Sequence, residues 1–261
     1  MMSWQTRLSG ALGVVGPGLR LGASTWMVEA SGRRLVVKLG PGSLDEADGL
    51  RRLRAVPGAP PVPELVLVED DLLVTTAIDQ MPSTPAHEES LGRALARLHR
   101  APFPQWGGGS SWIGSCRVDP AWCPDGAGFY GHRLQQLSAR CRLEEVVRPV
   151  IDRLEELLPS GGPALVHGDL WWGNVLFGTD DRSWLIDPSV HGGHPEEDLA
   201  MLALFGPVPP RALGAYLEVH PLSSGWEERI TLFQLYPLLV HSVLFGGSYP
   251  ARATTVARRF A

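Results

Sequence analysis

Three oxygen-bearing side chains in the second half of the sequence have the spacing of a phosphoryl-transfer site. Asp169 follows His167-Gly168, Asn174 lies five residues later, and Asp187 ends a separate short apolar run. In kinases with this pattern, one aspartate accepts the proton of the attacking hydroxyl, while an asparagine and a second aspartate hold magnesium beside the nucleotide phosphates. Carboxylate and amide oxygens are the ligands that Mg²⁺ prefers. The spacing predicts Asp169 as catalytic base and Asn174 and Asp187 as metal ligands, the alternative being a capped turn.

Lys38 is the only lysine among 23 basic residues, all the others being arginine. It ends the β-rich run Leu35-Val36-Val37, and in kinases a lysine at the end of such a strand contacts the nucleotide phosphates. Its compact ammonium fits between phosphate oxygens differently from a planar guanidinium. We expect Lys38 to bind phosphate, the alternative being a solvated lysine at a strand edge. Glu46 in the next helix is a candidate partner for it, with Asp45 and Asp48 as rivals.

The turn from Gly22 to Thr25 is the candidate cover for the phosphates, with backbone amides and two hydroxyls as donors. We therefore include Gly22 and Ser24 among the expected ATP contacts. A Walker A loop is excluded, because the only lysine is preceded by Val37 rather than glycine. The glycines between residues 13 and 18 do not form the G-x-G-x-x-G motif of a dinucleotide fold.

Aromatic and histidine residues near this motif could also bind a ligand. Trp171 and Trp172 lie between Asp169 and Asn174, where an exposed aromatic face could stack on a substrate, the alternative being packing of the loop itself. His191 and His194 lie near acidic residues, but no third histidine or cysteine stands at ligand spacing. A zinc site is therefore not expected.

The elements that position the lysine lie in the first 78 residues. Two β-rich runs flank Ser31-Gly32 as a hairpin, residues 44–56 have helical spacing, and two further β-rich runs flank Glu69-Asp70-Asp71. This pattern predicts a small antiparallel sheet with one helix over residues 1–78.

The remaining residues, 79–261, have a chiefly helical pattern. Short apolar runs at 164–166 and 184–186 lead into His167 and Asp187, and residues 230–245 are expected to form one buried helix. The predicted fold class is α+β, with a sheet-rich N-lobe joined at about Asp79 to a larger helical C-lobe.

The composition restricts the partners. The net charge is −5 and no basic run is longer than two residues, so a nucleic-acid surface is not expected. The chain has no signal-peptide pattern and no apolar stretch of the roughly 20 residues that a bilayer span needs. Three cysteines without C-x-x-C spacing fit a reducing compartment. We expect a cytoplasmic enzyme without membrane contact, and the composition leaves its oligomeric state open.

Several segments together resemble the fructosamine kinases, or ketosamine 3-kinases, a branch of the aminoglycoside phosphotransferase-like kinases with a protein-kinase-like fold. The matching segments are EADGLRRL, SWIGS, LVHGDLWWGN, IDPSVHGGHPEEDLAMLALFG and PLSSGWEERITLFQLYPLLVHSVLFGGSY. The last three are the most specific, because related choline, homoserine and aminoglycoside kinases share the Asp/Asn/Asp core but not these segments.

The resemblance implies transfer of the γ-phosphoryl group of ATP, with Mg²⁺, to the 3-hydroxyl of a free or protein-bound ketosamine, linked to deglycation. It implies that Lys38 and Glu46 form the phosphate-binding pair and that the backbone of Thr76-Ala77-Ile78 receives adenine. It also implies that Trp171 and His241 face the sugar.

Some positions depart from the family pattern. Trp172 stands where serine is frequent, Pro195 where arginine is frequent, Thr76 where glutamate is frequent, and the phosphate loop retains only Gly22. The alternatives to a ketosamine kinase are a related small-molecule kinase of the aminoglycoside, choline and homoserine group, or a nucleotide-binding pseudokinase.

Overall fold

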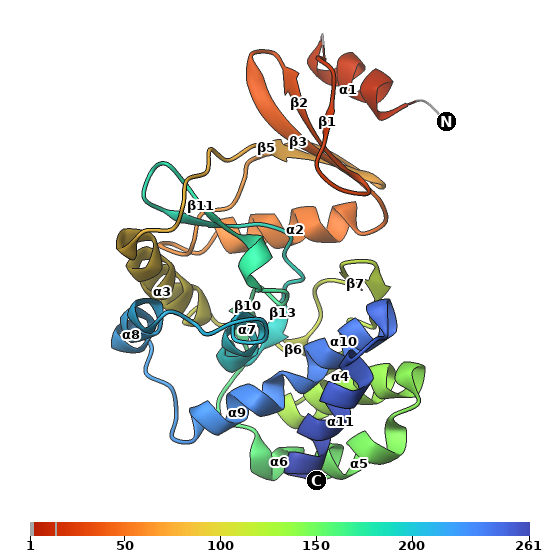
Figure 1. Ribbon diagram of the computed structural model, residues 1–261, viewed down its shortest axis with the longest axis vertical. Coiled ribbons are helices and arrows are strands. Elements are labelled where there is room, and N and C mark those ends of the chain that lie inside the picture. Colours follow the sequence, from red (N-terminus) through yellow and green to blue (C-terminus); the bar gives the residue numbers. More distant parts are fainter. Residues whose placement is uncertain (1–2, 14) are drawn as a thin grey trace.

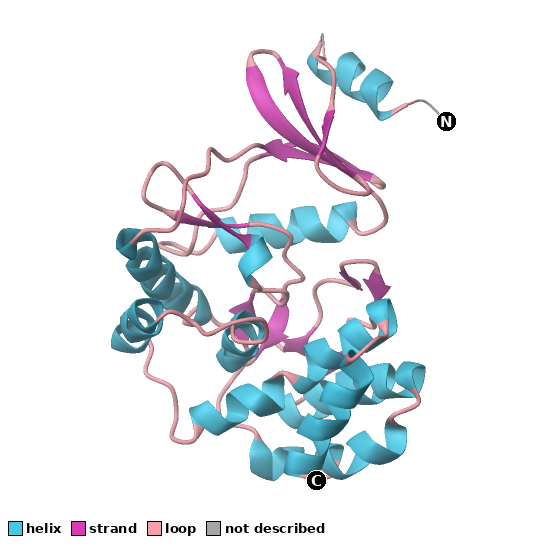
Figure 2. Ribbon diagram, in the orientation of Figure 1, coloured by secondary structure: helices cyan, strands magenta, loops and turns pink. Residues whose placement is uncertain are grey.

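The chain, seen in a computed structural model that describes residues 3–13 and 15–261, divides into a sheet-rich N-terminal part and a helical C-terminal part (Figure 1, Figure 2). The N-terminal part holds a five-stranded antiparallel sheet with the order β1-β2-β3-β5-β4. Its elements are α1 (Trp4–Leu12), β1 (Leu19–Arg20), β2 (Thr25–Ala30), β3 (Arg33–Leu39), α2 (Ser43–Arg54), β4 (Leu65–Glu69) and β5 (Leu72–Thr76). The predicted α+β class is confirmed.

The β2–β3 hairpin places Lys38 on a central strand. Ser31 and Gly32 at its turn have φ of 52° and 71°, the left-handed pair that suits the twist of a two-residue hairpin. Leu35 and Val37 of β3 are buried in one core with Leu8 of α1. Because side chains alternate along a strand, Lys38 projects from the opposite face of the sheet.

Helix α2 covers that opposite face. Asp45 and Glu46 lie in its first turn, where carboxylates favour the positive end of the helix dipole. Its buried face includes Ala47, Leu50 and Leu53, which belong to a core that also contains leucines of the C-terminal part. A Cβ at Gly49 would lie 3.1 Å from Pro188 Cγ, so the helix approaches the segment after Asp187 closely. Figure 1 shows α2 between the sheet and the C-terminal part.

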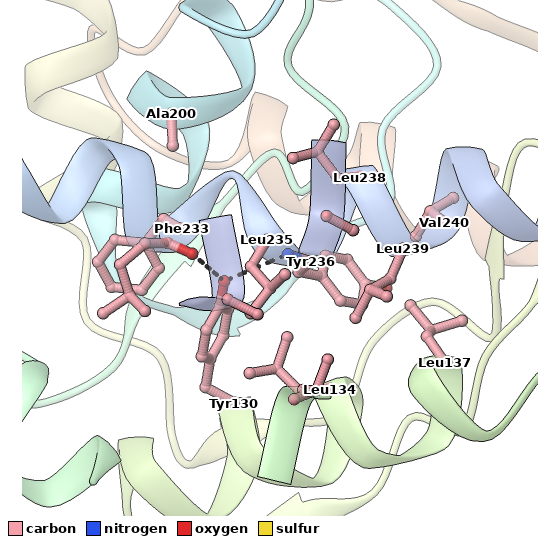
Figure 3. Close-up of a cluster of buried hydrophobic side chains, with 14 of the residues drawn as sticks. Tyr130, Leu134, Leu137, Ala200, Phe233, Leu235, Tyr236, Leu238, Leu239 and Val240 are labelled. Atoms are coloured by element: carbon pink, nitrogen blue, oxygen red, sulfur yellow. Dashed lines mark hydrogen bonds between the residues drawn. The ribbon is translucent and has the colours of Figure 1, made fainter. Parts of the chain in front are cut away.

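The helices of the C-terminal part surround a second, larger core. They are α3 (Pro85–His99), α4 (Gly126–Cys141), α5 (Glu144–Ile151), α6 (Leu154–Leu157), α7 (Pro195–Leu202), α8 (Pro210–Val219), α9 (Trp226–Phe233), α10 (Leu235–Phe245) and α11 (Tyr249–Phe260). Figure 3 shows part of this core, in which Leu134 and Leu137 of α4 face the side chains of α10. The Tyr130 hydroxyl donates a hydrogen bond to the Leu232 carbonyl at 3.0 Å, which satisfies both buried groups.

Short strands lead into the segments that contain His167 and Asp187. They are β6 (Trp106–Gly107), β7 (Trp112–Ile113), β8 (Cys116–Arg117), β9 (Trp122–Cys123), β10 (Ala164–Val166), β11 (Val175–Phe177), β12 (Ser183–Leu185) and β13 (His191–Gly193), with the 3-10 turn η1 (Trp172–Asn174). β10 leads directly into His167. β12 ends two residues before Asp187 and pairs with β11, which follows Asn174.

Three features differ from the sequence expectations. Residues 230–245 form the end of α9 and all of α10 rather than one helix, because Pro237 has no N–H to donate to the Phe233 carbonyl. The periodicity also gave no sign of α1 or of the short strands β6 to β9. β5 ends at Thr76 and α3 begins at Pro85, and the division after Ile78 stays a prediction. Within the ranges described, no helix has the length and apolarity needed to cross a membrane.

Candidate active site

A cavity of about 500 Å³ lies between α2 and the C-terminal part. It brings together eight of the twelve residues predicted for the site. These are Ser24, Lys38, Glu46, Asp169, Trp171, Asn174, Asp187 and His241. They come from both parts of the chain and span more than 200 positions, so the tertiary fold assembles the cavity.

Lys38 is held by two carboxylates. Its Nζ lies 2.7 Å from Glu46 Oε2 and 2.9 Å from Asp187 Oδ1. Burial alone would lower the pKa of Lys38, but the charges of Glu46 and Asp187 outweigh it and raise that pKa. Lys38 is therefore charged at neutral pH and fixed at the point where strand β3, helix α2 and the segment after β12 meet.

Glu46 is the partner of Lys38 because its rivals on α2 are engaged elsewhere. Asp45 Oδ2 accepts a hydrogen bond from the Ser111 N–H at 2.8 Å, and Asp48 pairs with Arg52 on the helix surface. Burial raises the pKa of Glu46, and the Lys38 charge opposes that rise. The sequence alone left this choice open.

The segment after β10 presents Asp169 to the cavity. Gly168 has φ of 82°, and a Cβ there would lie 2.1 Å from the Ser189 carbonyl oxygen, so the tight turn before Asp169 requires glycine. Asn174 Nδ2 donates to the Asp169 carbonyl at 2.8 Å and lies 3.3 Å from Asp169 Oδ2. Burial, and then the charge of Asp187, raise the pKa of Asp169 to about 7. A carboxylate with this pKa suits proton transfer near neutral pH.

Asp198 of α7 holds His167 and Gly168, the two residues before Asp169, in place. Its carboxylate accepts hydrogen bonds from the N–H groups of His167 at 2.7 Å and Gly168 at 2.9 Å, and lies 3.0 Å from His99 Nε2. Burial would raise the pKa of Asp198, but the hydrogen bond and charge of His99 lower it. His99 Nδ1 lies in turn 2.8 Å from the Tyr216 hydroxyl.

This buried chain of hydrogen bonds joins three side chains. The pKa of Tyr216 is raised by burial and by the charge of Asp198, so its hydroxyl keeps its proton. Asp198 accepts the hydrogen bond from His99 Nε2–H. The sequence reasoning missed all three residues, because His99 lies 99 positions from Asp198 and 117 positions from Tyr216 along the chain.

Asp187 adopts a left-handed backbone with φ of 56°, which few residues other than glycine tolerate. Aspartate and asparagine are the usual exceptions, because their short polar side chains stabilise this conformation locally. The conformation directs the chain from β12 to Pro188, which packs against Gly49 of α2. This strained position coincides with a carboxylate bound to Lys38, as is common at functional sites.

Asn174 and Asp187 fit a magnesium site. The Nδ2 of Asn174 donates to Asp169, so the amide oxygen of Asn174 remains as the atom that can coordinate a metal. Asp187 and Asp169 lie close enough for one charge to raise the pKa of the other acid, and a divalent cation would relieve that repulsion. Residues 3–13 and 15–261 hold no group of three or more His, Cys, Asp and Glu that could hold a metal. Mg²⁺ does not require one, because it keeps several waters and binds substrate phosphates.

Four predicted ATP contacts lie outside the cavity lining: Gly22, Thr76, Ala77 and Ile78. The N–H of Gly22 donates to the Thr25 carbonyl at 3.2 Å and closes the β1–β2 turn. The N–H groups of Thr76 and Ala77 donate to the carbonyls of Glu64 and Arg34 at 3.0 Å each. These three amides already have partners, and the assignment of the four residues to ATP stays a prediction.

The other end of the cavity is aromatic. Trp171 packs edge-on against Phe205 with ring centroids 6.1 Å apart, and Phe205 packs edge-on against His241 at 5.3 Å. His241 Nδ1 lies 2.6 Å from the Pro237 carbonyl, which can only accept, so Nδ1 carries the proton. Burial lowers the pKa of His241, which leaves the ring neutral with Nε2 as a hydrogen-bond acceptor.

Sequence reasoning assigned no role to several other residues of the cavity. Trp112 and Ser115 come from the SWIGS segment and Phe245 from the end of α10, and all three line the cavity. Trp112 also packs on Gly42, where a Cβ would lie 3.1 Å from its ring. The signal available in the sequence was the position of these residues inside the segments that resemble the family.

The chain matches the family model described as fructosamine kinase over residues 24–260. It is 32% identical over 230 residues to an Enterococcus faecium protein assigned as a ketoamine kinase, covering 82% of this chain and 81% of the relative. A solved structure from Thermobifida fusca, of a protein assigned as a fructosamine-3-kinase, superposes with a TM-score of 0.90 at 36% identity, covering 98% of this chain and 97% of that one.

More distant structures share the fold alone. The choline kinase LicA from Streptococcus pneumoniae has a TM-score of 0.68 at 16% identity, covering 98% of this chain and 96% of its own. The two-part architecture is therefore that of the protein-kinase-like phosphotransferases. With the family model matched over nearly the whole chain and the Thermobifida fusca structure superposed throughout, the chain belongs to the fructosamine kinase family of ATP-dependent phosphotransferases.

Proposed function

We propose that this protein transfers the γ-phosphoryl group of ATP to the 3-hydroxyl of a ketosamine. The observation that carries the proposal is the position of Asp169: a half-buried carboxylate with a pKa of about 7, in one cavity with Lys38, Asn174 and Asp187. Membership of the fructosamine kinase family supports the choice of acceptor.

Each residue then has a defined task. The acceptor oxygen attacks the γ-phosphorus, the bond from that phosphorus to the β-phosphate oxygen breaks, and ADP leaves. The proton of the hydroxyl passes to the Asp169 carboxylate. Lys38, held by Glu46, neutralises phosphate charge, and Ser24 contributes a hydroxyl at the same end of the cavity. Mg²⁺ held by Asn174 and Asp187 would supply further charge stabilisation on the phosphates.

Trp171 and His241 bind the acceptor in this proposal. Indole faces pack against the C–H faces of sugars, and the unprotonated Nε2 of His241 can accept a hydrogen bond from a sugar hydroxyl. The 3-phosphate formed is unstable in such a compound and releases the amine, which links the reaction to deglycation. The three cysteines are free thiols in the structure, which supports a reducing, cytoplasmic setting.

A substrate panel tests the proposal. ADP release is measured with fructosyl-, ribulosyl- and erythrulosyl-amines beside choline, homoserine and an aminoglycoside, and ³¹P NMR locates the new phosphate. We expect turnover of ketosamines and a 3-phosphate product, abolished in Asp169→Asn. Turnover of only a non-ketosamine, or ATP binding without any turnover, would contradict the proposal.

A further inference from the structure

The charged side chains of the cavity gather at one end. Lys38, Glu46, Asp169 and Asp187 are the Lys, Arg, Asp and Glu residues of the described lining. Lys38 contacts Glu46 and Asp187 directly, and the Asp187 charge acts on Asp169. The four residues therefore form one electrostatic unit, which the proposed function assigns to the phosphates and the base.

The opposite end is apolar and partly open to solvent. We define the aromatic wall as Trp171, Phe205, His241 and Phe245. Phe205 lies between the rings of Trp171 and His241, and the His241 and Phe245 centroids are 5.5 Å apart. The exposed fractions of Trp171, Phe205 and Phe245 are 40%, 44% and 67%. Large exposed aromatic side chains beside a cavity are typical of a ligand surface rather than a core.

Met201, Val240 and Leu244 extend this apolar surface within the cavity. A carboxylate bound here would lose hydration, which is unfavourable, because Lys38, the cation of the described lining, is already paired with Glu46 and Asp187. Arg252 lies outside the lining, with its guanidinium over the Tyr249 ring at 5.6 Å. An alkyl chain would bury apolar area against these side chains, and an alkylammonium is attracted to the faces of aromatic rings.

We infer that Phe245 of the aromatic wall binds the amine substituent of the acceptor, next to the sugar held by Trp171 and His241, and selects ketosamines whose amine carries an apolar stem over those with a carboxylate next to the amine. This inference rests on the proposed function, because it takes the sugar to lie between Phe245 and Asp169. Phe205 and Phe245 are the specificity-determining residues that it adds. Phe245 lines the cavity, and Phe205 holds Trp171 and His241 in place.

The test compares two acceptors with the same sugar: the fructose adducts of n-butylamine and of glycine. We expect kcat/KM for the butylamine adduct to exceed that for the glycine adduct by about tenfold or more, the scale of one or two apolar contacts in a pocket. Phe245→Ala should bring this ratio near one with an unchanged KM for ATP, and Phe245→Leu should retain part of the preference. Trp122→Ala, which removes an exposed aromatic side chain outside the lining, is the matched control.

The outcomes separate this inference from the proposed function. Equal kcat/KM for both adducts in the wild-type protein would overturn the inference and leave ketosamine phosphorylation intact. An equal loss on both adducts in Phe245→Ala, at an unchanged melting temperature, would also overturn it, because Phe245 would then act on the sugar. Failure to phosphorylate these adducts and the ribulosyl- and erythrulosyl-amines alike would overturn both.

Discussion

Asp45 in the first turn of α2 accepts a hydrogen bond from the backbone N–H of Ser111 at 2.8 Å. The two residues belong to different parts of the chain, and the loop of Ser111 continues into Trp112, which lines the cavity. The helix that carries Glu46 is thus tied to a loop of the C-terminal part that lines the same cavity. The position of the Lys38–Glu46 pair depends on this contact as well as on the N-terminal sheet.

We expect Asp45→Ala to lower the free energy of unfolding by about 1 kcal/mol, because the Ser111 N–H loses its partner. We also expect kcat to fall, since α2 would hold Glu46 less firmly. Asp48→Ala on the same helix removes only a surface pair with Arg52 and should cost less than about 0.5 kcal/mol. Chemical denaturation and steady-state kinetics measure both effects, and equal behaviour of the two variants would contradict the role of Asp45.

Lys38→Arg is expected to lower kcat/KM for ATP by at least about tenfold, because a guanidinium fork does not reproduce the compact contact of the ammonium with its two carboxylates. Its effect on the melting temperature should be small. Arg33→Lys, the reverse exchange in an exposed pair with Glu64, is the control and should leave the kinetics unchanged. Full activity of Lys38→Arg would show that the single lysine has no special role.

Asp169→Asn is expected to reduce kcat by about 10²- to 10⁴-fold while ATP binding persists, because the amide cannot accept the proton of the acceptor. The pKa of about 7 also sets a pH dependence. Below that pH the carboxyl is protonated, so kcat/KM should fall as pH falls. Bound Mg²⁺ would neutralise the charge of Asp187, which would lower the pKa of Asp169 and move this fall in kcat/KM to lower pH. If the wild-type rate did not change between pH 5 and 8, and stayed about 10²-fold or more above the rate of Asp169→Asn, then Asp169 would not act as the base.

Stability should fall in acid because of a buried cluster beneath β13. Burial lowers the pKa of His194 to about 4, so the unfolded chain binds its proton first and stability falls as pH drops from 6.5 to 4. Burial would raise the pKa of Glu197, but the hydrogen bond and charge of His191 and the charge of Arg133 lower it to about 2. Its contribution is present above pH 4.5 and is lost below it.

Melting temperatures measured from pH 7.5 to 3.5 test this dependence. His194→Gln should flatten the curve between pH 6.5 and 4, since glutamine does not titrate. A His194→Gln curve parallel to the wild-type curve in this range would show that His194 does not cause the loss.

The sequence predicted residues that belong to local motifs, at the end of a strand or in the turn after it. The fold class and family membership are confirmed, and Asp169, Asn174, Asp187 and Lys38 do share one cavity. Local spacing suffices to find each motif, whereas the fold brings Lys38 to the other three residues. Their individual catalytic roles stay predictions.

The residues that were missed depend on contacts between distant segments. The spacing alone left Glu46 as one of three candidates on α2, and the family resemblance, not the periodicity, singled it out; the choice depends on how the helix is rotated against Pro188 and the Ser111 loop. The missed Tyr216–His99–Asp198 chain joins α8, α3 and α7, and the missed Phe205 and Phe245 join the predicted Trp171 and His241 in the aromatic wall. The spacing of residues within one helix or strand does not indicate which distant segments that element contacts.

The left-handed backbone at Asp187 has a consequence for how this enzyme could lose activity in evolution. Asparagine and glycine tolerate φ of 56° as well as aspartate does, and each is one nucleotide away from an aspartate codon. A single mutation could thus remove the carboxylate without straining the turn, whereas alanine or valine would remove the carboxylate and destabilise the fold. Duplicated copies that drift at this position should therefore survive as folded, inactive proteins with asparagine or glycine there.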